Sequence, residues 1–276
     1  MGTRLKHAPV FFVVGQVRHS PVLKLDDLIP DFQEHLRKNG FPGYKANTSI
    51  SIEITTPTAP GQGPAVVQKP QTTHTFTSRD ETEAFIATSE SLAFQTVEYD
   101  TFGTLLEKFS MGLKAYNEVV APELVTGMGL RFLDAIVPKE NENLALYLRK
   151  ELLGLVEVLE TGWSADYQFY EASLRRNDQT LKSRAIFRNT TIQMPPDLAN
   201  TVQALPKRFA DVSATHALLD TDARFAPSAE QPMAFDVNEL TKRLTLLKKD
   251  ISDIFKATIT DEAIKIWKPL SHGSNE

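Results

Sequence analysis

The chain has 276 residues, which is enough for one large domain or two modest ones with an ample hydrophobic core. Its hydrophobic fraction of 41% and charged fraction of 24% are typical of a soluble globular protein, and the longest early apolar run, residues 10–14, is too short for a membrane span or a signal peptide. The net charge of −5 argues against nucleic-acid binding over the whole surface, and the absence of cysteine excludes disulfides, thiol nucleophiles and cysteine-bound metals. These features predict a cytoplasmic protein.

The first half of the chain predicts a strand, a helix, several antiparallel strands and a second helix. Residues 10–18 are apolar on both faces, which indicates a buried strand. Apolar residues then recur at helical spacing from Leu25 to Leu36, and Asn39-Gly40 ends that helix. Further strands are expected around residues 48–55, 65–67, 74–77, 84–88 and 92–97. The second helix follows over residues 102–120.

The second half predicts the same order. A two-sided strand over residues 126–137 divides the chain nearly in half, and a helix is expected over residues 143–160. A long hairpin, a Pro-containing connection and another strand are expected over residues 164–189, 194–212 and 216–225. A helix over Val237–Thr258 carries apolar residues at alternating spacings of four and three, close to a heptad seam, and a short helix capped by Thr260 follows.

This order predicts an α+β fold. We expect two tandem β-α-β-β-β-α units, residues 1–122 and 123–270, that form one or two antiparallel sheets with helices packed on one face. The polar tail, residues 271–276, is expected to be disordered.

Three short motifs, taken in chain order, resemble a known family. An Ala-Pro pair at Ala8-Pro9 precedes the first strand, a Gly-Leu-Arg-aromatic stretch at 129–132 lies in the central strand, and the C-terminal helix runs into an Ile-Thr-Asp-Glu turn at 259–262. In this arrangement the chain resembles a sporadically distributed family of uncharacterised bacterial proteins of about this length. The resemblance implies a bacterial origin and a defence or mobile-element system, and it implies no activity.

The residues that carry chemistry in other proteins do not form a recognisable catalytic motif here. The six histidines are scattered without metal-ligand spacing, and no Walker loop or nucleophile elbow is present. Asp220 and Asp222 are the weak catalytic candidates, because they share one face of a strand and two carboxylates can hold a hard cation. The competing interpretation is a solvated strand end paired with Arg224.

A basic stripe is predicted on the hairpin. Lys182, Arg184 and Arg188 share one face of the returning strand, with Arg175 and Arg176 near the turn. These side chains can bind an acidic protein surface, a phosphate-bearing ligand or a nucleic-acid backbone. The alternative is an ordinary wet face of a hairpin, neutralised by Asp166, Glu171 and Asp178.

Arg131 and Asp134 are the remaining candidates for binding. An arginine in a central strand can hold a ligand carboxylate or phosphate with two hydrogen bonds. The alternative is a structural ion pair between Arg131 and Asp134 that ties the two halves of the chain together.

The combined expectation is a non-enzymatic accessory or binding protein that recognises another macromolecule, with a protein favoured over nucleic acid as the partner. Neither a cofactor nor a metal nor a membrane is expected. Two alternatives stay open: a small-molecule sensor with a cavity between helices and sheet, gated by residues 56–64 and read by Arg131, and a metal-dependent phosphodiesterase or nuclease that uses Asp220 and Asp222. Oligomerisation through Val237–Thr258 is a further expectation.

Overall fold

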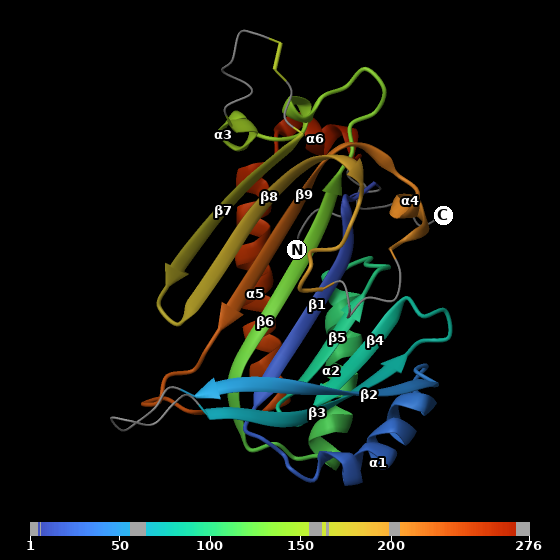
Figure 1. Ribbon diagram of the computed structural model, residues 1–276, viewed down its shortest axis with the longest axis vertical. Coiled ribbons are helices and arrows are strands. Elements are labelled where there is room, and N and C mark those ends of the chain that lie inside the picture. The colour runs from blue at the N-terminus through green and yellow to red at the C-terminus, as the bar shows by residue number, and fades with distance from the viewer. Residues whose placement is uncertain are drawn as a thin grey trace.

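The computed structural model describes residue 5 and residues 7–55, 65–154, 162–163, 166–198 and 205–268. The fold is α+β, with a ten-stranded antiparallel sheet and six α-helices in this part of the chain (Figure 1). The strands are β1 (Val10–His19), β2 (Gly43–Thr55), β3 (Ala65–Thr77), β4 (Glu83–Thr88), β5 (Ser91–Thr96), β6 (Leu124–Ile136), β7 (Tyr167–Arg176), β8 (Gln179–Thr191), β9 (Ser213–Phe225) and β10 (Met233–Ala234). The helices are α1 (Leu25–Lys38), α2 (Phe102–Val119), α3 (Lys150–Leu153), α4 (Lys207–Ala210), α5 (Val237–Thr258) and α6 (Asp261–Ile266), with a 3-10 turn, η1, at Leu144–Leu146.

The two halves of the chain share one sheet. Its strand order is β2-β3-β4-β5-β1-β6-β9-β8-β7, and β10 adds a short pairing to β6. Strands β1 and β6 are antiparallel neighbours in the middle, with Gly15 opposite Leu130. The expected strand over 126–137 is therefore the central strand β6, and its apolar residues on both faces match its position between two layers.

The three long helices, α1, α2 and α5, cover one face of the sheet, and α2 and α5 lie behind it in Figure 1. The heptad-like seam of α5 faces this core, so Leu240, Leu244 and Leu247 are fully buried within the chain. Close packing between α2 and the sheet requires glycine at Gly112, because a Cβ atom there would lie 2.1 Å from Cε1 of Phe85.

The opposite face is covered in part by the connection from β8 to β9, which carries α4. Phe209 of α4 packs edge-on against Phe11 of β1, with ring centroids 5.7 Å apart. Leu133 of β6 and Leu218 of β9 belong to the same apolar cluster. Among the described residues, no helix covers the neighbouring part of this face, over β9, β8 and β7.

The helix expected over residues 143–160 is wrong as a continuous element. The described part contains η1 and the four-residue helix α3, which ends at Gly154 with a φ of 70°. Backbone hydrogen bonds to the end of α5 replace the helical ones: the amide of Arg149 donates to the carbonyl of Thr258, and the amide of Thr260 donates to the carbonyl of Tyr147. Residues 155–161, the loop 56–64 and the tail 271–276 lie outside the described residues.

None of the helices in the described ranges is long and apolar enough to cross a membrane.

Candidate functional site: a charged face of the sheet

Side-chain alternation along four neighbouring strands gathers charged residues on the face opposite the long helices. In register, Arg131 of β6 lies opposite Asp222 of β9, and Asp222 lies opposite Lys182 of β8. Asp220 lies opposite Arg184, which in turn lies opposite Glu171 of β7. We call this set, together with one residue of the β8–β9 connection, the charged face: Arg131, Glu171, Lys182, Arg184, Arg188, Asp197, Asp220, Asp222 and Arg224.

Arg131 is the centre of the charged face. Its Nε donates to Oδ1 of Asp220 at 2.7 Å and its Nη2 donates to Oδ2 at 2.8 Å, which is the two-bond geometry that guanidinium and carboxylate groups favour. Its Nη1 donates to Oδ2 of Asp197 at 2.5 Å. Burial alone would lower the pKa of Arg131, but its hydrogen bonds to Asp220 and Asp197 raise it above the usual value. Arg131 is therefore held as a cation between two carboxylates.

The two carboxylates differ in exposure. The side chain of Asp220 is 1% exposed and also accepts a hydrogen bond from Nη1 of Arg184 at 2.8 Å. The side chain of Asp197 is 62% exposed and lies on the irregular connection between β8 and β9. The hydrogen bond from Arg131 lowers the pKa of Asp197. Asp220 is thus part of the sheet, whereas Asp197 reaches Arg131 from the surface.

The rim of the charged face carries exposed charges. Nε of Arg184 donates to Glu171 at 2.6 Å, and Lys182 lies 3.9 Å from the same carboxylate. Nη2 of Arg224 donates to Oδ2 of Asp222 at 2.6 Å, while most of the Arg224 side chain is exposed. These pairs lie at the edge of the protein interior, where the cations Lys182 and Arg224 remain exposed to solvent.

The predicted basic stripe is divided by the structure. Lys182, Arg184 and Arg188 share the charged face, and the guanidinium of Arg188 lies 5.4 Å from the ring centroid of Tyr167. Arg176 instead forms an ion pair with Asp250 of α5, on the helix side. Arg175 is exposed at the end of β7 and lies on the same side of the sheet as the charged face, because it is opposite Thr180, which in turn is opposite Arg224. Four of the five basic residues that were expected to lie together therefore share one side of the sheet, and Arg176 does not.

The expected ion pair between Arg131 and Asp134 is wrong. They are three positions apart in β6, an odd separation, so their side chains point to opposite faces of the sheet. Asp134 lies on the helix side, where burial raises its pKa to about 7 against the attraction of Lys248. Lys248 of α5 is itself placed with its Nζ 4.6 Å from the ring centroid of Phe132, and burial lowers its pKa. Asp134 and Arg131 are thus separate sites.

Metal binding by Asp220 and Asp222 receives no geometric support. Within the described residues, no group of three or more His, Asp or Glu side chains could hold a metal ion. Each of the two carboxylates is already bound by arginine, Asp220 by Arg131 and Arg184, and Asp222 by Arg224. A metal would have to displace these guanidinium groups first.

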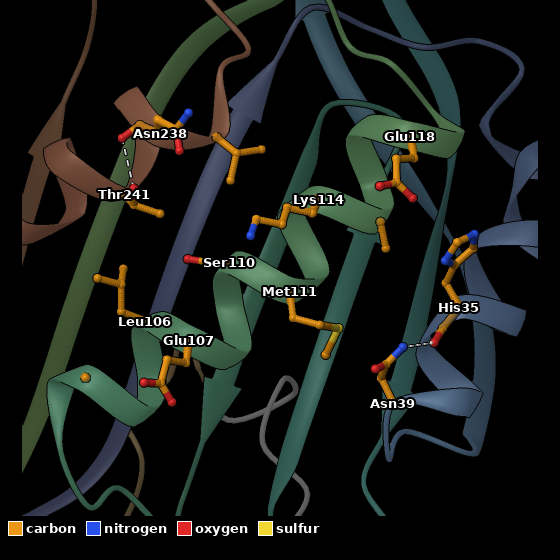
Figure 2. Close-up of a pocket in the computed structure, with 13 residues that line it drawn as sticks. His35, Asn39, Leu106, Glu107, Ser110, Met111, Lys114, Glu118, Asn238 and Thr241 are labelled. Carbon is orange, nitrogen blue, oxygen red and sulfur yellow. Dashed lines mark hydrogen bonds between the residues drawn. The ribbon is translucent and has the colours of Figure 1, made fainter.

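A hollow of about 710 Å³ lies on the helix side, between α1, α2 and α5 (Figure 2). Its lining is mixed, with Leu106 and Met111 beside Glu107 and Lys114 of α2. Arg131 points to the other face of the sheet, so it cannot read a ligand in this hollow as the sensor alternative supposed. The proposed gate, residues 56–64, lies outside the described residues.

Sequence reasoning missed Asp197 and Lys248. Asp197 follows two prolines in a connection without periodicity, so no pattern places it near a strand. Lys248 lies on α5 one residue beyond the apolar seam position Leu247, and only its packing against Phe132 marks it as partly buried.

No protein-family model matches the chain, and no curated protein is significantly similar to it.

Proposed function

We propose that the protein is a non-enzymatic binding protein whose charged face recognises an acidic segment of another protein. The observation that carries the proposal is the unequal pair of carboxylates on Arg131. Asp220 holds the guanidinium from inside the sheet, and Asp197 occupies its outer side from an exposed, irregular segment. An aspartate or glutamate of a partner can take the place of Asp197 without disturbing the bond to Asp220.

The surroundings of Arg131 favour an anion in the same place. Lys182, Arg188 and Arg224 lie on the same face, and the side chains of Lys182 and Arg224 are 44% and 62% exposed. They attract an acidic segment before contact and orient it, which raises the association rate more than the final affinity. A segment with separated carboxylates suits this face better than a continuous phosphate backbone does, because Glu171 and Asp222 lie between the cations and repel a uniform row of negative charge.

Exchange of Asp197 sets a limit on affinity. The partner must compete with a carboxylate that is tethered to the site and therefore present at high effective concentration. Removal of Asp197 should consequently strengthen binding, which is the opposite of what removal of a residue that contacts the partner would do.

The test is fluorescence anisotropy with a labelled hexaglutamate peptide at physiological salt. We expect Asp197→Ala to bind the peptide more tightly than the wild type, and the double variant Lys182→Glu/Arg188→Glu to lose binding. Lys249→Glu is the matched control, because Lys249 is an exposed lysine of α5 on the other side of the sheet. Equal binding by all four proteins would contradict the proposal, and tight binding of oligothymidine in place of the peptide would assign the face to nucleic acid.

We also propose that the sheet consists of two tandem β-α-β-β-β-α units, residues 1–122 and 123–270. The strand order supports this, because β1 is flanked by β5 and β6 is flanked by β9, and each of these is the last strand of its half in the main strand order. A chain divided between residues 122 and 123 should reassemble when both fragments are expressed together, through the pairing of β1 with β6. Fragments that stay apart although each is soluble would contradict this organisation.

A further inference from the structure

We propose that two copies of the chain form a dimer by antiparallel pairing of their β7 strands, with the two-fold axis at Ala172. Strand β7 is the last strand of the sheet, and β8 pairs its inner edge from Tyr167 to Arg176. Among the described residues, no strand pairs with its outer edge. The outer edge therefore presents a row of backbone N–H and C=O groups that another strand can bind.

Strand β7 has few of the features that keep sheet edges apart. Exposed edges are usually short, bulged, interrupted by proline, or charged, most often with lysine. Of the charged residues of β7, Glu171 is paired with Arg184 and Arg176 with Asp250 inside the chain. Strand β7 has ten residues, contains neither proline nor lysine, and pairs with β8 without a register shift. It also carries large exposed apolar side chains, including Tyr170 at 42% and Leu174 at 46% exposure. Such an edge favours a partner strand over solvent.

Symmetry restricts the possible registers. A two-fold axis perpendicular to the sheet keeps each side chain on its own face, and opposite residues of antiparallel strands also share a face. The axis must therefore pass between the two copies of one residue of β7. With Ala172 on the axis, Tyr170 lies opposite Leu174 of the second copy, and the same contact is repeated on the other side of the axis. Both pairs lie on the helix side of the sheet. The two exposed apolar side chains of each copy thus cover those of the other.

The same register suits the opposite face. Phe169 lies opposite Arg175 of the second copy, which allows a cation–π contact, and Glu171 lies opposite Ser173. Moving the axis to Glu171 would place the two Glu171 carboxylates directly opposite each other, which is destabilising. Moving it to Ser173 would confine pairing to residues 170–176 and leave Phe169 opposite the turn. The Ala172 register is therefore the longest one without opposed like charges.

The absence of cysteine allows a direct test by disulfide cross-linking. Opposite residues of antiparallel strands have Cα atoms about 4.5–5.5 Å apart, a separation that a disulfide spans. Ala172→Cys should therefore form a covalent dimer under mild oxidation. Arg175→Cys alone should not, because the two copies of residue 175 would be roughly 20 Å apart along the strands. A mixture of Phe169→Cys and Arg175→Cys should cross-link, although neither variant does so alone.

Light scattering after size exclusion tests the dimer without cysteine. The wild type should be dimeric over a concentration series, and Ala172→Lys, which places two ammonium groups at the axis, should be monomeric with an unchanged circular dichroism spectrum. A monomeric wild type, or failure of Ala172→Cys to cross-link in a folded protein, would overturn the proposal. Cross-linking by Ser173→Cys but not by Ala172→Cys would overturn the register.

Discussion

Replacement of Asp220 by alanine should destabilise the protein more than any other single change on the charged face. The Asp220 carboxylate accepts three hydrogen bonds, from Nε and Nη2 of Arg131 and from Nη1 of Arg184, at 2.7, 2.8 and 2.8 Å. Asp220→Ala leaves the buried guanidinium of Arg131 with Asp197 alone, at the surface. Breaking a buried pair in this way costs about 3–5 kcal/mol of the free energy of unfolding.

Urea denaturation followed by circular dichroism measures this loss, with the slope of the transition checked for two-state behaviour. Asp253→Ala is the control, because Asp253 forms an exposed pair with Lys249 on α5, and its transition should coincide with that of the wild type. The double variant Arg131→Met/Asp220→Leu should be more stable than Asp220→Ala, since it removes the unpaired charge as well.

A loss below about 1 kcal/mol for Asp220→Ala would refute this reasoning, because that is the range of ordinary surface substitutions. A double variant with a lower free energy of unfolding than Asp220→Ala would also contradict it, because the unpaired buried charge would then not be the main cause of the loss.

Three further predictions concern the helix side of the sheet. Burial raises the pKa of Asp134 from 3.8 to about 7, so the stabilising contribution of the protonated carboxyl is complete below about pH 4 and is lost as the pH rises through about 7. Asp134→Asn should therefore raise the free energy of unfolding at about pH 8 and flatten its pH dependence, and an unchanged pH profile would contradict this. Gly112→Ala should lower the free energy of unfolding by about 1–3 kcal/mol, because the new Cβ atom clashes with Phe85. Gly103→Ala on the same helix should leave it unchanged, because the nearest atom to its Cβ would be 3.7 Å away. Equal thermal midpoints for the two variants would contradict this. Asp236→Ala should cost about 1 kcal/mol, because the Asp236 carboxylate accepts a hydrogen bond from the amide of Glu239 and caps α5, and an unchanged urea midpoint would exclude a capping role.

Local periodicity was sufficient to predict much of this fold. The helix over Val237–Thr258 and the central strand were predicted from apolar spacing, because each presents its core face in an uninterrupted pattern. The same period of two placed Asp220 with Asp222, and Lys182 with Arg184, on shared faces. This period does not reveal which strands are neighbours, so it cannot identify the partners of Arg131, which depend on the order of strands in the sheet.

The errors arose where distant residues override local preference. Residues 143–153 have a helical apolar pattern, but Thr260 and the end of α5 capture the backbone groups that a helix would use. Arg131 and Asp134 are close in sequence but do not meet, because residues an odd number of positions apart in a strand point to opposite faces of the sheet. Asp197 lies in an irregular segment, where a single sequence contains no periodic signal.

Binding of an acidic segment to the charged face can be observed at the arginine side chains themselves by NMR. The Nε–H resonances of Arg131, Arg184 and Arg224 report on this face, and that of Arg37, paired with Glu34 on α1, reports on a distant surface. On titration of Asp197→Ala with hexaglutamate, we expect the first three resonances to shift along one saturating curve while Arg37 stays unchanged. Shifts at Arg37 alone, or no saturable shift at Arg131, would contradict binding at this face.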